Sequence, residues 1–200
     1  MNPLNSIKGT IISGVVLAII IAALIGGVGF NGMQFDRWLH VLSGVLWIGL
    51  LYYFNFVQVP ALGEAAADEG GPGGGGITKY VAPLALLWFR WAALATWLTG
   101  AYYLMVNKNL IGAFMLGMGG DSLNVYQLII GLGAWMGTIM LFNVWHLIWP
   151  NQKKVLGIVE ATADEIARAK RVAFLASRTN TFLSIPMLMC MTGAVHGLPF

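Results

Sequence analysis

The chain has 200 residues, of which 58% are hydrophobic and only 10% are charged, with a formal net charge of +3. Soluble domains average about 25% charged residues, so this composition excludes an ordinary soluble enzyme and predicts a bundle of membrane helices. The single cysteine, Cys190, excludes a disulfide framework, a thiolate zinc site and a CxxCH haem-attachment motif.

Hydrophobic runs long enough to cross a bilayer recur along the chain. A helix needs about 20 apolar residues to cross a hydrocarbon core of roughly 30 Å. Four runs predict such spans, with the second and fourth ending before Pro60 and Pro150 and the third beginning at Pro83: 10–30, 38–59, 83–106 and 125–149. A fifth expected span, 172–196, contains a polar run and Pro186, which we expect to kink the helix. The expected fold is an all-α integral membrane bundle of about five transmembrane helices in a single domain.

Three segments connect the later spans. Residues 61–82 include the run 70–76, which is all glycine except for one proline, and this composition predicts a flexible Gly-rich loop. Residues 107–124 are also rich in glycine and mildly apolar, as in a segment that lies at the membrane interface. Residues 151–171 alternate apolar and charged side chains, which predicts a surface helix leading into the fifth span.

Lysine and arginine are distributed unequally between the two sides that five spans define. Arg37 and Lys108 fall on one side, and nine basic residues fall on or nearest to the other: Lys8, Lys79, Arg90, Lys153, Lys154, Arg168, Lys170, Arg171 and Arg178. Because basic residues concentrate on the cytoplasmic side, we expect a cytoplasmic N-terminus and a periplasmic C-terminus. The basic residues do not alternate with aromatic ones on a soluble face, so no nucleic-acid partner is expected.

Two histidines are expected at the same depth near the outer surface. His40 begins the second span and His196 ends the fifth, and the expected haem site also includes Arg37, Ser43 and Gly44. The small residues one turn from His40 leave room for a flat macrocycle, and imidazoles from two facing helices commonly hold a b-type haem. Two alternatives stay open: interfacial histidines that only bond water, headgroups or carbonyls, and ligation with the third histidine or to another metal.

A second set of polar residues is expected near the inner side. Its members are Asn55, Gln58, Arg90, Asn143, His146, Arg178 and Asn180. Two guanidinium groups without a nearby carboxylate indicate an anionic partner, such as a planar anionic substrate, a haem propionate or a lipid phosphate. A quinone carbonyl could also accept hydrogen bonds from these donors. The alternative is that Arg90 reaches the headgroups and the amides only hold helices together.

Four segments together resemble the N-terminal membrane domain of bacterial cytochrome-linked urate oxidases, also called urate hydroxylases. They are residues 37–58, 88–91 with 96–100, 143–154 and 177–187. The strings Pro-Asn-Gln-Lys-Lys at 150–154 and Ser-Arg-Thr-Asn-Thr at 177–181 carry most of the specificity.

The resemblance implies a bacterial inner-membrane protein of purine breakdown that oxidises urate and passes electrons to a c-type cytochrome. Members of that family carry a C-terminal cytochrome domain, whereas this chain ends at Phe200 without a CxxCH motif. We therefore expect only the membrane part, contributing to urate oxidation together with a separate cytochrome c; the resemblance assigns no catalytic residue.

The expected function is a membrane redox subunit that binds haem b. Its expected partners are the lipid bilayer, a c-type cytochrome or a larger respiratory complex, and urate or a quinone as a small molecule. The alternative is a cofactor-free accessory subunit packed on a larger respiratory or photosynthetic membrane complex.

Overall fold

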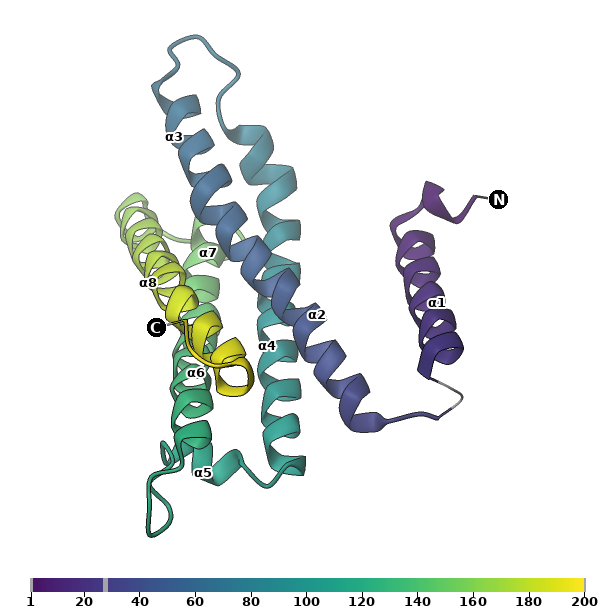
Figure 1. Ribbon diagram of the computed structural model, residues 1–200. Helices are drawn as coiled ribbons and strands as arrows, with labels where there is room; N and C mark the ends of the chain where they lie inside the picture. Colours follow the sequence, from purple (N-terminus) through teal and green to yellow (C-terminus); the bar gives the residue numbers. More distant parts are fainter. Residues whose placement is uncertain (1, 27–28, 200) are drawn as a thin grey trace. The chain divides into compact units, whose positions relative to one another are not determined.

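The computed structural model describes residues 2–26 and 29–199, and within these ranges the protein is helical with no strand. The all-α fold class is thereby confirmed. The chain divides into two compact units, residues 1–35 and 36–200. In chain order the elements of Figure 1 and the short turns between them are η1 (Pro3–Asn5), α1 (Ile7–Gly26), α2 (Gly32–Tyr53), η2 (Phe54–Gln58), α3 (Val59–Ala67), η3 (Ile77–Val81), α4 (Ala82–Val106), α5 (Leu110–Phe114), α6 (Val125–Phe142), η4 (Asn143–Ile148), α7 (Trp149–Val155) and α8 (Ala163–His196).

Within the described ranges, four helical stretches are long and apolar enough to cross a membrane, as expected of a membrane protein. They are Ile7–Gly26, Gly32–Ala67, Ile77–Val106 and Val125–Val155, and they contain most of the first four expected spans. Residues 27–28 of the first expected span lie outside the described residues. The fifth expected span, 172–196, lies inside the single 34-residue helix α8. Charged residues and the polar run lower the mean hydropathy of α8, so this span stays a prediction.

Three prolines that were expected to bound helices lie inside continuous helical segments. Pro60, Pro83 and Pro150 each occupy the second residue of an α-helix that directly follows a π-helical turn, namely η2, η3 and η4. A proline removes one backbone donor, and its ring clashes with the carbonyl one turn earlier. We attribute the wider π turns to this clash, because they give the ring room and let the helix continue.

The expected connecting segments are shorter than the sequence indicated. Helical structure extends into the expected loop 61–82 from both sides, so only residues 68–74 are non-helical. The expected surface helix over 151–171 is interrupted, because α7 ends at Val155 and α8 begins at Ala163. Thr162 and Glu165 form a reciprocal capping box that starts α8 afresh.

The first unit contains α1 and the start of α2. No residue of α1 is buried, and an exposed helix that is apolar all round is typical of a span that faces lipid. Asn31 begins the next helix, because its side-chain oxygen accepts from the backbone N–H groups of Met33 and Gln34, both at 3.1 Å.

The second unit is built around a core of large apolar side chains. Trp47 and Leu51 from α2, Phe89 from α4, Met140 from α6 and Val144 from η4 are each at most 2% exposed. In Figure 1, α3 and the start of α4 lie at the top of this unit and α5 lies at the bottom. We call the end formed by α3, η3, α7 and the first turns of α8 the basic end, since it carries most of the lysines and arginines.

Candidate functional site

A cavity of about 750 Å³ lies at the basic end. It is bounded by η2, α3, η3, the first turns of α4, α7 and α8. Its polar lining residues are Asn55, Gln58, Thr78, Gln152, Lys170, Arg171 and Ser177, and its larger apolar ones include Phe54, Leu86, Phe89, Ile148 and Phe174. Sites for small organic ligands have this size and this mixture of an apolar wall with a few polar groups.

Burial separates a deep wall of the cavity from its rim. Phe54, Asn55, Gln58 and Phe89 are all buried, and the rings of Phe54 and Phe89 pack edge to face with centroids 5.4 Å apart. The cations that line the cavity, Lys170 and Arg171, are exposed. The cavity is therefore apolar and aromatic at depth and positively charged where it opens.

The two amides of the deep wall differ in their hydrogen bonding. Asn55 Nδ2 donates to the carbonyl oxygen of Leu51 (2.9 Å) and to Ser177 Oγ (2.8 Å). Gln58 is only 8% exposed, yet its Oε1 has no hydrogen-bond partner in the described part of the chain. Leaving a buried polar atom unpaired costs about 1–3 kcal/mol, so an unpaired amide beside a cavity indicates a place where a ligand can bond.

Two members of the expected inner cluster are paired outside this cavity. Asn143 Nδ2 donates to Asn180 Oδ1 at 2.8 Å, and Asn180 Nδ2 donates to the carbonyl oxygen of Met140 at 3.0 Å. Asn180 is fully buried, and both of its amide atoms are satisfied. This network holds α8 to α6 and η4, which is the structural role that the alternative interpretation assigned to the amides.

The other three members of the expected inner cluster each contact a different aromatic ring. Arg90 places its guanidinium 3.8 Å from the centre of the Trp149 ring, whereas the exposed Arg178 lies 5.2 Å from the ring of Phe174. His146 is exposed and stacks on the phenylalanine four residues earlier. None of these three lines the cavity, so of the seven expected residues only the two amides of η2 do.

A second region of interest surrounds His40, toward the opposite end of the unit. Its Nδ1 lies 2.8 Å from the carbonyl oxygen of Thr96 and 3.3 Å from Thr99 Oγ1. A carbonyl oxygen only accepts, so Nδ1 carries the proton and donates, and in the neutral ring Nε2 is the free acceptor. A Cβ added to Gly100 would lie 2.8 Å from His40 Cε1. The absence of a side chain at Gly100 therefore lets the imidazole lie directly against α4.

The other residues of the expected haem site have mixed surroundings. His196, in the last turn of α8, is exposed, and so is Arg37. A Cβ added to Gly44 would lie 3.6 Å from Thr96 Cγ2, so Gly44 faces α4. Asp36, one turn before His40, is buried, and its Oδ2 is unpaired among the described residues.

One hydrogen bond between α2 and α8 and another between η2 and α8 relate the positions of the two histidines along their helices. The hydroxyls of Tyr52 and Ser184 bond at 3.0 Å, and the Asn55–Ser177 bond shows that the two helices run in opposite directions. His40 lies twelve residues before Tyr52, and His196 lies twelve after Ser184. At about 1.5 Å per residue, both are about 18 Å from the same contact along their helices. This register concerns their depth and not the distance between the rings.

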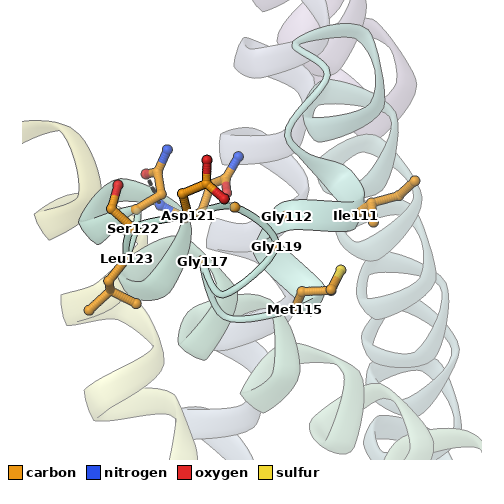
Figure 2. Close-up of a pocket in the computed structure, with 11 residues that line it drawn as sticks. Ile111, Gly112, Met115, Gly117, Gly119, Asp121, Ser122 and Leu123 are labelled. Atoms are coloured by element: carbon orange, nitrogen blue, oxygen red, sulfur yellow. Dashed lines mark hydrogen bonds between the residues drawn. The ribbon is translucent and has the colours of Figure 1, made fainter.

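A further hollow, of about 490 Å³, lies in the loop between α5 and α6 (Figure 2). Figure 2 shows Asp121 and Ser122 on one side of this loop and Ile111 and Met115 on the other. The two amide side chains that line it are already bonded: Asn124 accepts from the backbone N–H of Gln127 and caps α6, and Gln127 Nε2 donates to Asn109 Oδ1. With no cation and no buried unpaired atom among its lining residues, this hollow is not a candidate site.

Sequence reasoning missed several residues of both regions. Lys170 and Arg171 were counted only as surface charge, since nothing in the sequence shows that α8 brings them to η2. Thr96 and Gly100 were recognised only as part of a family string, although a Thr–x–x–Thr–Gly pattern facing a histidine could have indicated a ring packed on a helix.

Comparison with known proteins bears on the C-terminal part of the chain. Residues 123–200 match a family model described as urate oxidase N-terminal. No match was found among curated proteins or among solved structures. Two of the four segments that carry the resemblance, 143–154 and 177–187, lie within the matched range. The resemblance to the urate oxidase N-terminal family is therefore confirmed, with residues 123–200 as the part that matches it.

Proposed function

We propose that this chain is a membrane redox subunit of the urate oxidase type, holding a b-type haem through His40 and His196 and passing electrons to a c-type cytochrome. The observation that carries this proposal is the state of His40. Its Nδ1 is fixed by the Thr96 carbonyl, and its Nε2 has no hydrogen-bond partner among the described residues.

The donor set at His40 fits a haem iron. Histidines that ligate metals almost always donate their second ring nitrogen to a carbonyl or carboxylate, which fixes both the tautomer and the ring orientation. Thr96 supplies this contact, and Gly100 lets the ring pack flat on α4. His196 has an exposed side chain and no hydrogen bond to a described residue, so it is free to serve as the second ligand at similar depth. A haem held here would supply one-electron transfer.

The charge distribution supports an orientation for this subunit. The basic end carries Lys79, Lys153, Lys154, Arg168, Lys170 and Arg171. The positive-inside rule therefore favours a cytoplasmic basic end in the bacterial inner membrane. His40 and His196 then lie toward the periplasm, where c-type cytochromes accept electrons. The family similarity supports urate as the molecule that is oxidised.

The absorption spectrum of the purified full chain tests this proposal. We expect a Soret band, with α and β bands that sharpen on dithionite reduction, and we expect His40→Ala to lose most of the bound haem. His146→Ala is the matched control, because His146 is exposed and stacks on Phe142 away from this region; its spectrum should match the parent. A folded parent protein without a Soret band would overturn the proposal and favour a cofactor-free accessory subunit.

A further inference from the structure

The cavity at the basic end is not explained by electron transfer at the other end of the molecule. Of the groups that line it, the Gln58 amide makes no hydrogen bond to a described residue, although the side chain is more than nine-tenths buried. Lys170 and Arg171 line the same cavity from α8. The side chains therefore supply an amide in need of a partner and two cations without a carboxylate among the lining residues.

The deep wall defines the body of a suitable ligand. Phe54, Leu86 and Phe89 present flat and branched apolar surface, and Phe54 and Phe89 are held edge to face. Aromatic rings pack favourably on such surfaces through offset or edge-to-face contacts. At about 750 Å³ the cavity has room for a ligand with more than one ring.

The polar groups define the two ends of that ligand. A hydroxyl group suits the Gln58 amide, because it can donate to Oε1 and accept from Nε2. An anionic group suits the rim, because Lys170 and Arg171 supply charge-assisted donors. A ligand that contacts both the amide and the cations while its body packs on Phe54 and Phe89 needs the hydroxyl and the anion at separate positions on an aromatic body.

We propose that the basic-end cavity binds a planar hydroxyaromatic acid, with its ring system against Phe54 and Phe89, its hydroxyl on Gln58 and its carboxylate at Lys170 and Arg171. This inference goes beyond the redox proposal. It needs no haem, and its test reads binding alone.

Three probes separate the contributions of the two ends. The experiment is isothermal titration calorimetry of the purified full chain in nanodiscs, with protein-free nanodiscs subtracted to remove partitioning into lipid. 6-Hydroxy-2-naphthoate carries both groups, 2-naphthoate lacks the hydroxyl, and 2-naphthol lacks the carboxylate. We expect 6-hydroxy-2-naphthoate to bind about tenfold more tightly than either of the other two, since one well-placed hydrogen bond is worth about one decade in Kd.

Substitutions then assign each preference to its residue. Gln58→Leu keeps the side-chain volume and removes an unpaired amide, so it should fold normally and bind 6-hydroxy-2-naphthoate and 2-naphthoate equally. The double variant Lys170→Ala, Arg171→Ala should lose the preference for the acids over 2-naphthol. Arg168→Ala is the matched control, because Arg168 is an exposed cation of the same helix that does not line the cavity; it should bind like the parent.

The opposite results would overturn the inference. Equal affinities of the parent for all three probes, or no binding above that of empty nanodiscs, would mean that the cavity does not select such a ligand and holds only water or lipid. A hydroxyl preference that persists in Gln58→Leu would remove Gln58 from the site, and an acid preference that persists in the double variant would remove the two cations. A missing Soret band would leave these binding results unaffected, so the two proposals fail separately.

Discussion

The contact between α6 and α8 differs from the basic-end cavity in how each treats buried polar groups. Along α6 and α8, Asn143, Asn180 and the Met140 carbonyl form a closed network, and Gly133 lets the helices approach closely. At the cavity, Gln58 is also buried, but its Oε1 has no partner among the described residues. Both regions drew attention in the sequence for the same reason, namely polar side chains in an apolar chain.

The difference shows how structural and ligand-directed polar groups can be told apart. A paired amide between helices replaces its lost hydration with protein bonds and adds stability. An unpaired amide beside open volume keeps its bonding capacity for something else. Substituting such groups by apolar residues of similar size should therefore have opposite consequences in the two regions.

Asn180→Leu should give the largest effect. It leaves the Asn143 side-chain amide unpaired in the core and removes one of the hydrogen bonds to the Met140 carbonyl, which keeps the Asn143 backbone N–H as a donor. An unpaired buried group costs about 1–3 kcal/mol, and a lost hydrogen bond about 0.5–1.5 kcal/mol. The free energy of unfolding in detergent, measured by denaturant titration, should fall by about 2–4 kcal/mol. Gln58→Leu is the matched control and should change stability by less than about 0.5 kcal/mol. A similar loss in both variants would remove the distinction between the two regions.

Gly133→Ala should destabilise the same contact by a smaller amount. An added Cβ would lie 3.2 Å from both Cys190 Cβ and Met191 Cε, which is tight for a packed interface. Overpacking of this kind costs about 1–3 kcal/mol. Gly137→Ala is the control on the same helix, since its Cβ would meet nothing within 4 Å. It should stabilise by up to about 1 kcal/mol, because alanine favours helix. Thermal unfolding of the two variants would show equal shifts if close packing were irrelevant.

Arg90→Ala should lower the free energy of unfolding by about 0.5–2 kcal/mol. The guanidinium lies 3.8 Å from the centre of the Trp149 ring, within the range of a cation–π contact. Arg90→Lys should retain part of this stabilisation, because a lysine keeps the charge but not the planar stacking. Arg178→Ala, with its exposed side chain, should cost less. If Arg90→Ala proved neutral while Arg178→Ala did not, the assignment of the two arginines would be reversed.

The smallest effect is a local dependence on pH at the start of α8. The backbone N–H of Thr162 and the Lys154 ammonium group hold the pKa of Glu165 below its ordinary value of 4.5. A lowered pKa means that the ionised cap contributes fully above that ordinary value and is lost as the pH falls through the lower folded-state value. Hydrogen exchange of the peptide around residues 162–168, corrected for intrinsic rates, should therefore accelerate in acid.

Glu165→Gln is the matched variant for this experiment, because it keeps an acceptor oxygen but does not titrate. Its exchange in the same peptide should show no acid-dependent step. If the parent and Glu165→Gln accelerated together, another group would be responsible for the fraying of this helix.

The sequence predicted the fold well because hydropathy and helix length are local properties. Four of the five expected spans coincide with long apolar helices. The helix ends at Pro60 and Pro150 were not predictable from proline alone, since a π turn absorbs the missing donor and lets the helix continue. The capping box at Thr162 was readable in the sequence, and it explains why residues 151–171 do not form one helix.

The candidate site was less predictable, because it depends on which helices meet. The expected inner cluster treated Asn55 and Asn143 alike, yet one bonds Ser177 beside a cavity and the other bonds Asn180 inside a helix contact. Depth along the membrane is readable from the sequence, whereas rotation about each helix axis is not. That rotation decides that His40 faces Thr96 on α4.

The ligation of a haem by two histidines is the central claim, and electron paramagnetic resonance of the oxidised full chain tests it most directly. We predict a low-spin ferric signal typical of two imidazole ligands, which converts to a high-spin signal or disappears in His40→Ala and in His196→Ala but persists in His146→Ala. A low-spin signal that survives both of the first two substitutions, or a parent protein with no ferric haem signal, would contradict the claim.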